Sequence, residues 1–384
     1  MHLIAQVKLQ PTTEQKDFLH QTLRAANAAC AYASHVAWET KTFRQFSLQH
    51  ACYRELRRRF GLGAQMAIRV LAKVADAYRL DRKTRRTFAC RGSIAFDRRN
   101  LSWNLDRRIV SLWTTGGRQR IPFVCGKRQA ELLAMQAGES DLVYRDGTFY
   151  LYAGCEVEPP DPLTIADFLG VDVGLTHLAV TSDGRSFGGG HVLGLRHRHR
   201  RLRRRLQRKG TKAATRLLRH RRRQERRFMT DVNHCVSKQL VTTAQDTSRG
   251  IALEDLTGIR RRVSVRRRQR VTLHSWTFGQ LRSFVEYKAR RAGVPVVLVD
   301  PRNTSRTCLA CGHVDKANRK SQAEFRCITC GFAGPADHCA AENIRRVAVN
   351  QPHVSPADVK TRARKRSRTA TEGRGKPAPA GAGR

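Results

Sequence analysis

The first part of the chain changes from strand-like alternation to helical spacing of its apolar residues. Residues 2–9, HLIAQVKL, alternate and predict a strand, and a threonine in the PTTEQ that follows can cap a helix. Apolar residues three and four positions apart predict two further helices, at about 48–59 and 64–78. We therefore expect one strand and then a helical block over residues 11–90.

The period becomes two after the helical block. Four segments alternate between apolar and polar residues, the first of them at 93–105, and turn signals such as Asp146-Gly147 lie between them. We predict a β-barrel or sandwich made of residues 1–10 and 91–163. The helical block is then an insertion between its first strand and the others.

Residues 164–350 show the mixed pattern of an α/β domain. The apolar runs FLGVDVGLTHLAV, IALED and PVVLVD predict buried strands, and Asp183-Gly184 predicts a hairpin turn after the first. Two basic helices separated near Gly210, and a later apolar stripe at helical spacing, lie between these strands. Residues 351–384 are rich in Ala, Pro, Gly, Lys and Arg, which predicts a disordered basic tail. The expected fold class is α+β with several domains.

The charge balance indicates a polyanionic partner. The 384 residues include 74 Lys and Arg against 31 Asp and Glu, a formal net charge of +43, and such an excess favours nucleic acid. No run approaches the ~18 apolar residues of a membrane-spanning helix, and no signal-peptide pattern opens the chain. We expect a cytoplasmic, nucleoid-associated prokaryotic protein with no membrane partner.

Two carboxylates interrupt the apolar strand runs. Asp172 lies in the first run, and alternation places Glu254 on the small-residue face of the second, with Asp255 turned to the opposite face. A third acid, Asp337, precedes an apolar helical stripe. Three converging carboxylates suit hard Mg²⁺ ions. Two such ions can activate a water and stabilise the leaving oxygen of a phosphodiester.

Simpler interpretations of these acids stay open. A carboxylate on a strand can serve as a buried hydrogen-bond acceptor, and Asp337 can be the N-cap of the helix that follows it. Asp255 competes with Glu254 for the second position because the two are adjacent.

Four of the eleven cysteines form two C-x-x-C pairs, which match the template of a four-thiolate zinc ribbon over residues 305–334. The predicted ligands are Cys308, Cys311, Cys327 and Cys330. Because four thiolates close a tetrahedron, we expect structural Zn²⁺ here and not a disulfide framework. His313 and Cys339 are available as substitute ligands.

Blocks of like charge repel unless an anion lies against them, so the basic helices and the ribbon loop are candidates for phosphate contact. The selected nucleic-acid-binding residues are Arg198, Arg201, Arg204, Lys209, Arg221, Arg260, Arg261, Lys288, Arg319 and Lys320.

In this order the motifs resemble those of the TnpB family of transposon-encoded RNA-guided endonucleases, which is related to type V CRISPR effector nucleases. GVDVGLTHLAV, ALEDL and ADHCAAENI resemble the three motifs of a RuvC-like, RNase H-type nuclease, and TSRTCLACG with FRCITCG resembles the family's zinc ribbon. The resemblance is specific over most of residues 165–349. Before them it is looser, and the strand, helices and barrel resemble the wedge and recognition parts of the family. Cys339 departs from the Asn that relatives usually have there.

The resemblance implies catalytic acids at Asp172, Glu254 and Asp337, Mg²⁺ as the catalytic metal, a structured guide RNA and a target DNA read by base pairing. Proteins of this family are often labelled transposases. Two other functions stay open: an RNA-guided or sequence-tolerant DNA-binding protein that does not cut, and a structure-selective junction resolvase. The pattern does not indicate an oligomeric state.

Overall fold

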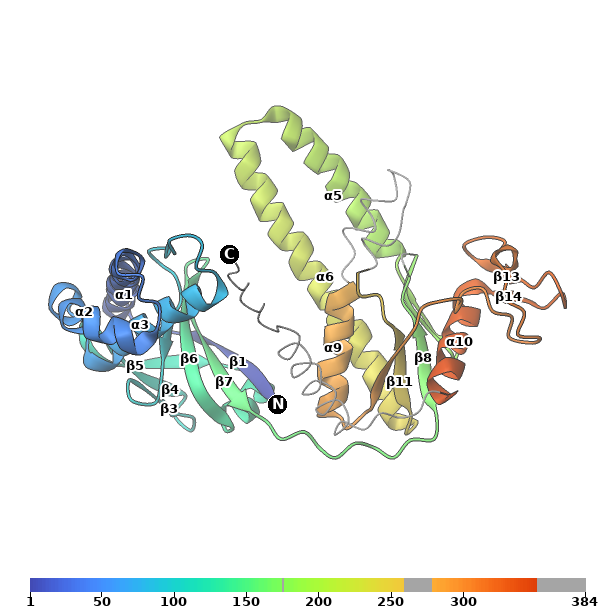
Figure 1. Ribbon diagram of the computed structural model, residues 1–384, viewed down its shortest axis with the longest axis horizontal. Coiled ribbons are helices and arrows are strands. Elements are labelled where there is room, and N and C mark those ends of the chain that lie inside the picture. Colours follow the sequence, from blue (N-terminus) through green and yellow to red (C-terminus); the bar gives the residue numbers. More distant parts are fainter. Residues whose placement is uncertain (175, 259–277, 351–384) are drawn as a thin grey trace, which may run out of the picture. The chain divides into compact units, whose positions relative to one another are not determined.

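The computed structural model describes residues 1–174, 176–258 and 278–350. The chain divides into two compact units, Met1–Glu158 and Pro159–Arg384 (Figure 1). The predicted tail at 351–384 lies outside the described residues.

A seven-stranded antiparallel sheet forms the centre of the N-terminal unit, in the order β2-β6-β7-β1-β5-β4-β3. Its strands are β1 (His2–Leu9), β2 (Ile94–Phe96), β3 (Leu101–Asn104), β4 (Ile109–Thr114), β5 (Gly117–Val124), β6 (Gln136–Arg145) and β7 (Thr148–Glu156). The first strand lies between β7 and β5, with His2 opposite Glu156 and Lys8 opposite Val124. Over the described residues β2 and β3 remain the two edges, so the sheet is nearly closed but is not a complete barrel.

Four helices accompany this sheet: α1 (Thr13–Glu39), α2 (Gln45–Phe60), α3 (Ala64–Leu80) and the short α4 (Lys127–Leu133), which the pattern did not predict. Thr12 caps α1 by accepting from the backbone N–H of Gln15, and the Gln15 side chain accepts from the backbone of Thr12. The alternating segment 93–105 forms two strands, because a turn at Asp97 separates β2 from β3. One apolar core joins the helices to the sheet.

The C-terminal unit is built on a five-stranded mixed sheet in the order β10-β9-β8-β11-β12. Its strands are β8 (Phe168–Asp172), β9 (His177–Thr181), β10 (Ser186–Gly188), β11 (Gly250–Glu254) and β12 (Val296–Val299). The strands β8, β9 and β10 are antiparallel neighbours, whereas β8, β11 and β12 run parallel. The predicted turn at Asp183-Gly184 joins β9 to β10, and Gly184 has a positive φ of 79°.

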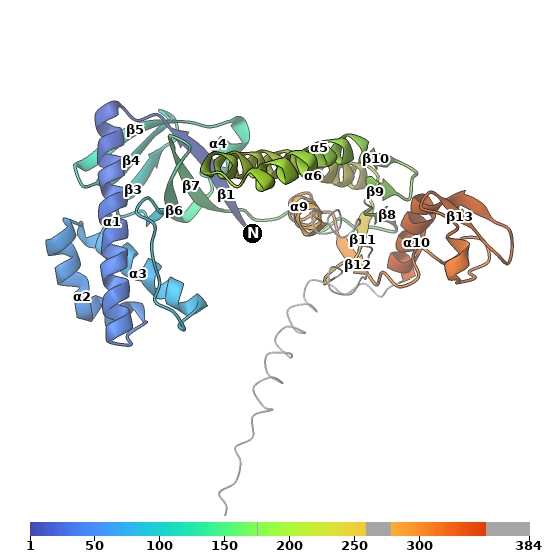
Figure 2. The same ribbon diagram turned by 90° about the horizontal axis from the view of Figure 1, so that it is seen from above.

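Helices cover both faces of this sheet (Figures 1 and 2). On one face, alternate residues such as Val171 and Leu253 pack with apolar residues of α6 (Lys212–Asp246) and α9 (Phe278–Arg291). On the other face, Phe168 and Ala252 pack with Ile344 and Ala348 of α10 (Ala336–Asn350). The period of two along each strand therefore assigns its residues to one helical layer or the other.

Two insertions extend from this three-layer core. The basic helices α5 (Gly190–Lys209) and α6 are separated at Gly210, as predicted, because that residue is left-handed with a φ of 63°. A small lobe between β12 and α10 contains the short 3-10 helix η1 (Lys316–Asn318) and the antiparallel pair β13 (Glu324–Arg326) and β14 (Ala333–Pro335). We call this lobe, residues 305–334, the ribbon.

Candidate functional site

Two acids end neighbouring parallel strands of the C-terminal sheet. Asp172 is the last residue of β8 and Glu254 the last of β11, and the register places Val171 opposite Leu253 one position earlier. The two carboxylates therefore lie side by side at the carboxyl edge of the sheet. By alternation both belong to the face that α10 covers. In open α/β sheets ligands bind at this edge.

The third acid reaches this edge because α10 packs closely on β8. Asp337 is the second residue of α10, so it lies within the first helical turn and is not the N-cap. A Cβ on Gly170 would lie 2.1 Å from the carbonyl oxygen of Ala341. The glycine in the middle of β8 thus allows direct contact between the helix backbone and the strand.

Asp172 lies within range of the charges of both other acids. Burial, followed by the carboxylates of Glu254 and Asp337, raises the pKa of Asp172 to about 7. Burial also raises the pKa of Glu254, while the Thr304 hydroxyl, which donates to Glu254 Oε1, and the charge of Arg319 act in the opposite direction. We call Asp172, Glu254 and Asp337 the acid cluster. Its mutual repulsion would be relieved by a bound cation.

The acid cluster is more open than a single-ion site. In the described part of the chain, only the four cysteines of the ribbon form a group of three or more potential ligands whose ligand atoms all lie within 4.8 Å of one another. The carboxylate oxygens of the three acids are spaced more widely.

Two basic side chains occupy the two oxygens of Asp337. Arg319 donates from Nη2 to Oδ1 at 3.0 Å, and the Nδ1 of His177 lies 3.0 Å from Oδ2. Arg319 comes from the ribbon and was predicted only as a nucleic-acid contact. Nothing in the residue pattern singled out His177 or Thr304, because their roles depend on contacts between elements far apart in the chain.

The four predicted cysteines of the ribbon meet in one cluster. The Sγ atoms of Cys308 and Cys330 are 3.6 Å apart, as are those of Cys311 and Cys327. Each C-x-x-C turn is followed by a glycine with positive φ, 73° at Gly312 and 74° at Gly331. The cluster has the ligands of a four-thiolate metal site.

The two proposed substitute ligands lie outside this cluster of four. Cys339 is buried against Cys308 and Cys327 but is not among the four grouped ligands. His313 contributes its backbone carbonyl, which accepts from the N–H of Cys308.

The predicted nucleic-acid contacts have different surroundings. Arg198, Arg201, Arg204 and Lys209 on α5, Arg221 on α6 and Lys320 on the ribbon are exposed. Lys288 on α9 is less accessible, because its Nζ donates to the carbonyl of His234 and the hydroxyl of Ser237 on α6. Arg260 and Arg261 lie outside the described residues. Among the described helices, none has both the length and the apolar character needed to cross a membrane.

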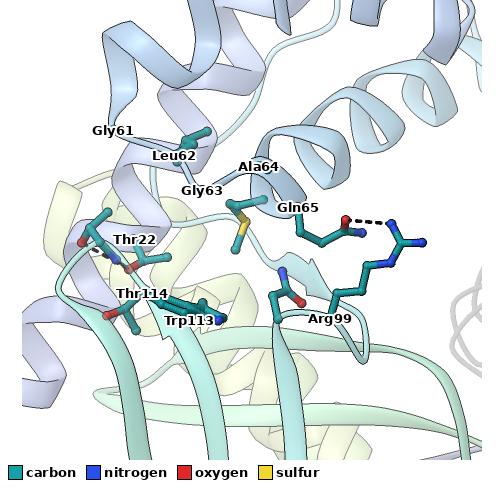
Figure 3. A pocket seen from close by; sticks show the side chains of 12 residues that line it. Thr22, Gly61, Leu62, Gly63, Ala64, Gln65, Arg99, Trp113 and Thr114 are labelled. Carbon is teal, nitrogen blue, oxygen red and sulfur yellow. Dashed lines mark hydrogen bonds between the residues drawn. The ribbon is translucent and has the colours of Figure 1, made fainter. Parts of the chain in front are cut away.

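The N-terminal unit contains a pocket of about 260 Å³ between α1, α3 and the strand β4 (Figure 3). Asn100 lines it and is only 3% exposed, and its Nδ2 has no hydrogen-bond partner among the described residues. Trp113, 48% exposed, and the Arg99 side chain, which donates to Gln65, complete the rim. An exposed aromatic side chain such as Trp113 can stack on a planar group such as a nucleobase.

A known family model matches one segment of the C-terminal unit. Residues 278–344, which include α9, the ribbon and Asp337, match the family model of the Cas12f1-like TNB domain. The resemblance predicted from the sequence motifs is thereby confirmed for this segment.

Curated relatives of this chain have Cas12f1 and TnpB-like names. A CRISPR-associated endodeoxyribonuclease Cas12f1 of Sulfoacidibacillus thermotolerans is 40% identical over 118 residues, covering 30% of this chain and 26% of the relative. A TnpB-like protein of Methanocaldococcus jannaschii is 35% identical over 121 residues, covering 31% of this chain and 43% of the relative. The chain thus spans less than half the length of each of these relatives.

The fold comparison extends over more of the molecule. The chain is similar to the Cas12f1 chain in a solved complex with sgRNA and target DNA, with a TM-score of 0.59, 15% identity, and coverage of 87% of this chain and 83% of that one. The protein therefore shares the multidomain fold of Cas12f1.

Proposed function

We propose that this protein is a transposon-associated, RNA-guided DNA endonuclease, and that its C-terminal unit is a RuvC-like, RNase H-type nuclease domain. The main support is the acid cluster, because three residues remote in sequence meet at the edge of the sheet where ligands bind. The endodeoxyribonuclease name of a relative and the shared fold agree with this function.

The acid cluster fits Mg²⁺, since its donors are carboxylate oxygens, and two ions that share these acids would suit phosphodiester cleavage. Bound Mg²⁺ would activate a water and stabilise the leaving oxygen of the phosphodiester. The chain's own part is to hold the carboxylates on rigid strands and on a helix start. Arg319, already beside Asp337, is placed to attract the anionic strand.

The remaining surfaces suit a guide RNA and a target DNA. The exposed arginines of α5 and α6 would contact phosphates, and the pocket at Asn100 would receive a base. The cysteine cluster would hold Zn²⁺ as a structural metal. In this assignment residues 1–10 and 91–163 form the wedge-like part, residues 11–90 the recognition insertion, and residues 164–350 the nuclease domain.

Substitutions of two adjacent acids, Glu254 and Asp255, test the function directly. The protein would be purified with its copurifying RNA, the RNA sequenced, and a plasmid matching its guide segment used as substrate. Glu254→Gln removes a carboxylate of the acid cluster, and we expect cleavage to fall by more than the ~100-fold that loss of an outer partner of a metal ligand costs. RNA binding should be retained.

Asp255→Asn is the matched control. Asp255 faces away from the acid cluster and pairs with Arg282 at 2.9 Å, so this variant should cut at nearly the wild-type rate. Undiminished cutting by Glu254→Gln would refute the proposed site. Cutting of branched DNA by protein free of RNA would instead indicate a junction resolvase, and RNA-directed binding without any cutting would indicate a DNA-binding protein.

A further inference from the structure

The two oxygens of Asp337 face different parts of the molecule. Oδ1 accepts from Arg319, a cation whose charge also acts on Asp172 and Glu254 and opposes the rise of their pKa values. Oδ2 is 3.0 Å from the Nδ1 of His177. A carboxylate oxygen accepts only from a ring nitrogen that bears a proton, so Nδ1 is the donor in this contact.

We propose that His177 is a positioning residue for Asp337: its Nδ1–H holds Oδ2 and thereby keeps Oδ1 directed toward the position of the divalent ion. This inference rests on the proposed function, because it takes Asp337 as a metal ligand. Oδ1 already lies against a positive charge, the guanidinium of Arg319, whereas Oδ2 lies against His177. Partners of this kind fix the orientation of a metal-binding side chain without touching the metal.

The backbone around His177 makes it a stable support. His177 is the first residue of β9, and its Cα is paired with Gly188 of β10. The preceding residue, Thr176, accepts from the N–H of Gly189. Since β9 also pairs with β8, the imidazole is carried by the same hairpin as Asp172. Two neighbouring strands of one sheet thus supply an acid of the cluster and the donor that orients another.

If the role of His177 were merely structural, its substitution would have a different effect. His177 is 42% exposed and Asp337 14%, so the contact is partly open to solvent. Pairs that are open to solvent contribute little to stability. A tie between the hairpin and α10 would therefore alter unfolding slightly and leave metal affinity unchanged, whereas a positioning role alters metal affinity.

Three substitutions of His177 distinguish the contribution of Nδ1 from that of Nε2. In His177→Asn the amide N–H takes the place of Nδ1–H, since both nitrogens are bonded to Cγ. In His177→Gln the amide lies one bond farther out, as Nε2 does, and His177→Leu has no donor. His338→Leu is the matched control, because His338 follows Asp337 on α10 but bonds the backbone carbonyl of Ser182.

Metal binding is measured by titrating Mn²⁺ into the full-length, zinc-loaded protein without nucleic acid and recording free Mn²⁺ by electron paramagnetic resonance. We expect His177→Leu and His177→Gln to weaken binding by about 10–100-fold. His177→Asn and His338→Leu should bind like the wild type. In the RNA-guided cleavage assay, the Mg²⁺ concentration for half-maximal rate should rise in the Leu and Gln variants, while the rate at saturating Mg²⁺ stays near that of the wild type.

Wild-type Mn²⁺ affinity in His177→Leu would overturn the inference, and so would a loss in His177→Asn as large as that in His177→Leu. Failure of the proposed function gives another result, because Glu254→Gln and the wild type would then bind Mn²⁺ equally well.

Discussion

The ribbon and the acid cluster both have the ligands of a cation site, yet the chain assembles them in opposite ways. The ribbon draws its four thiolates from two tight turns in one short segment, and their Sγ atoms lie within 4.8 Å of one another. The acid cluster draws its carboxylates from β8, β11 and α10, which are far apart in the chain and meet only after the sheet has formed. If the ribbon holds its proposed metal, its fold should depend on that metal, whereas the geometry of the acid cluster depends on the packing of the whole unit.

The largest expected effect is on the ribbon. Structural zinc contributes about 10–16 kcal/mol to the folding of isolated zinc-finger peptides, so Cys327→Ser should release the metal and unfold residues 305–334. Zinc content and limited proteolysis measure this loss. Cys339→Ser, in the same buried cluster but outside the four ligands, should retain its zinc. Equal zinc loss in both variants would contradict the four-ligand site.

A smaller effect should appear when the packing beneath the acid cluster is disturbed. Gly170→Ala brings a methyl group against the backbone of α10, and overpacking of this kind costs about 1–3 kcal/mol of stability. The displacement should move Asp337, and a shift of about 1 Å at a reacting centre can cost about 100-fold in rate.

Cleavage rates and thermal unfolding of the Gly170→Ala variant give the two values. Gly194→Ala on α5 is the control, because the added methyl group there meets open space. If Gly170→Ala cuts as fast as the control, the acid cluster does not depend on this contact.

The third effect is a pH dependence of stability to which the acid cluster contributes through Asp172. Burial and the neighbouring acids raise the pKa of Asp172 to about 7 in the folded protein, whereas an Asp in an unfolded chain has a pKa of ~3.9. Between these values the folded state holds a proton that the unfolded state has released, so the free energy of unfolding falls as pH rises from about 4 to about 7. Asp172→Asn has no titrating group at this position, so its free energy of unfolding should not fall for this reason.

Melting temperatures without added Mg²⁺, from about pH 5 to about pH 8, test this prediction. The wild type should lose stability relative to Asp172→Asn as the pH rises. Asp255→Asn should not become more stable than the wild type as the pH rises, because the Thr257 hydroxyl and Arg282 lower the pKa of Asp255. A constant difference between the wild type and Asp172→Asn would show that neither burial nor the neighbouring acids raise the pKa of Asp172.

The sequence was informative wherever a short-range rule governs the structure. Alternation predicted the shared face of Asp172 and Glu254, because a period of two is a property of each strand by itself. The C-x-x-C spacing predicted the cysteine cluster for a similar reason, since each turn is local. The break at Gly210 and the cap at Thr12 belong to the same category.

The contacts that complete the site could not be predicted in this way. His177, Thr304 and Arg319 reach the acids from a strand, a loop and the ribbon, and only the tertiary fold sets those distances. The same is true of the pocket at Asn100, whose walls come from separate helices and strands. A strand pattern also says nothing of whether the two edges of a sheet will join, which is why the N-terminal sheet was expected to be more closed than it is.

The position of β1 has a consequence for biosynthesis. This strand leaves the ribosome before its partner β7, which ends at Glu156, so one side of β1 stays unpaired until nearly the whole N-terminal unit has been translated. Pairings this distant in sequence form slowly, and an unpaired strand is prone to aggregation while it waits. The sheet of the N-terminal unit is therefore completed in one late step, when β7 pairs with β1.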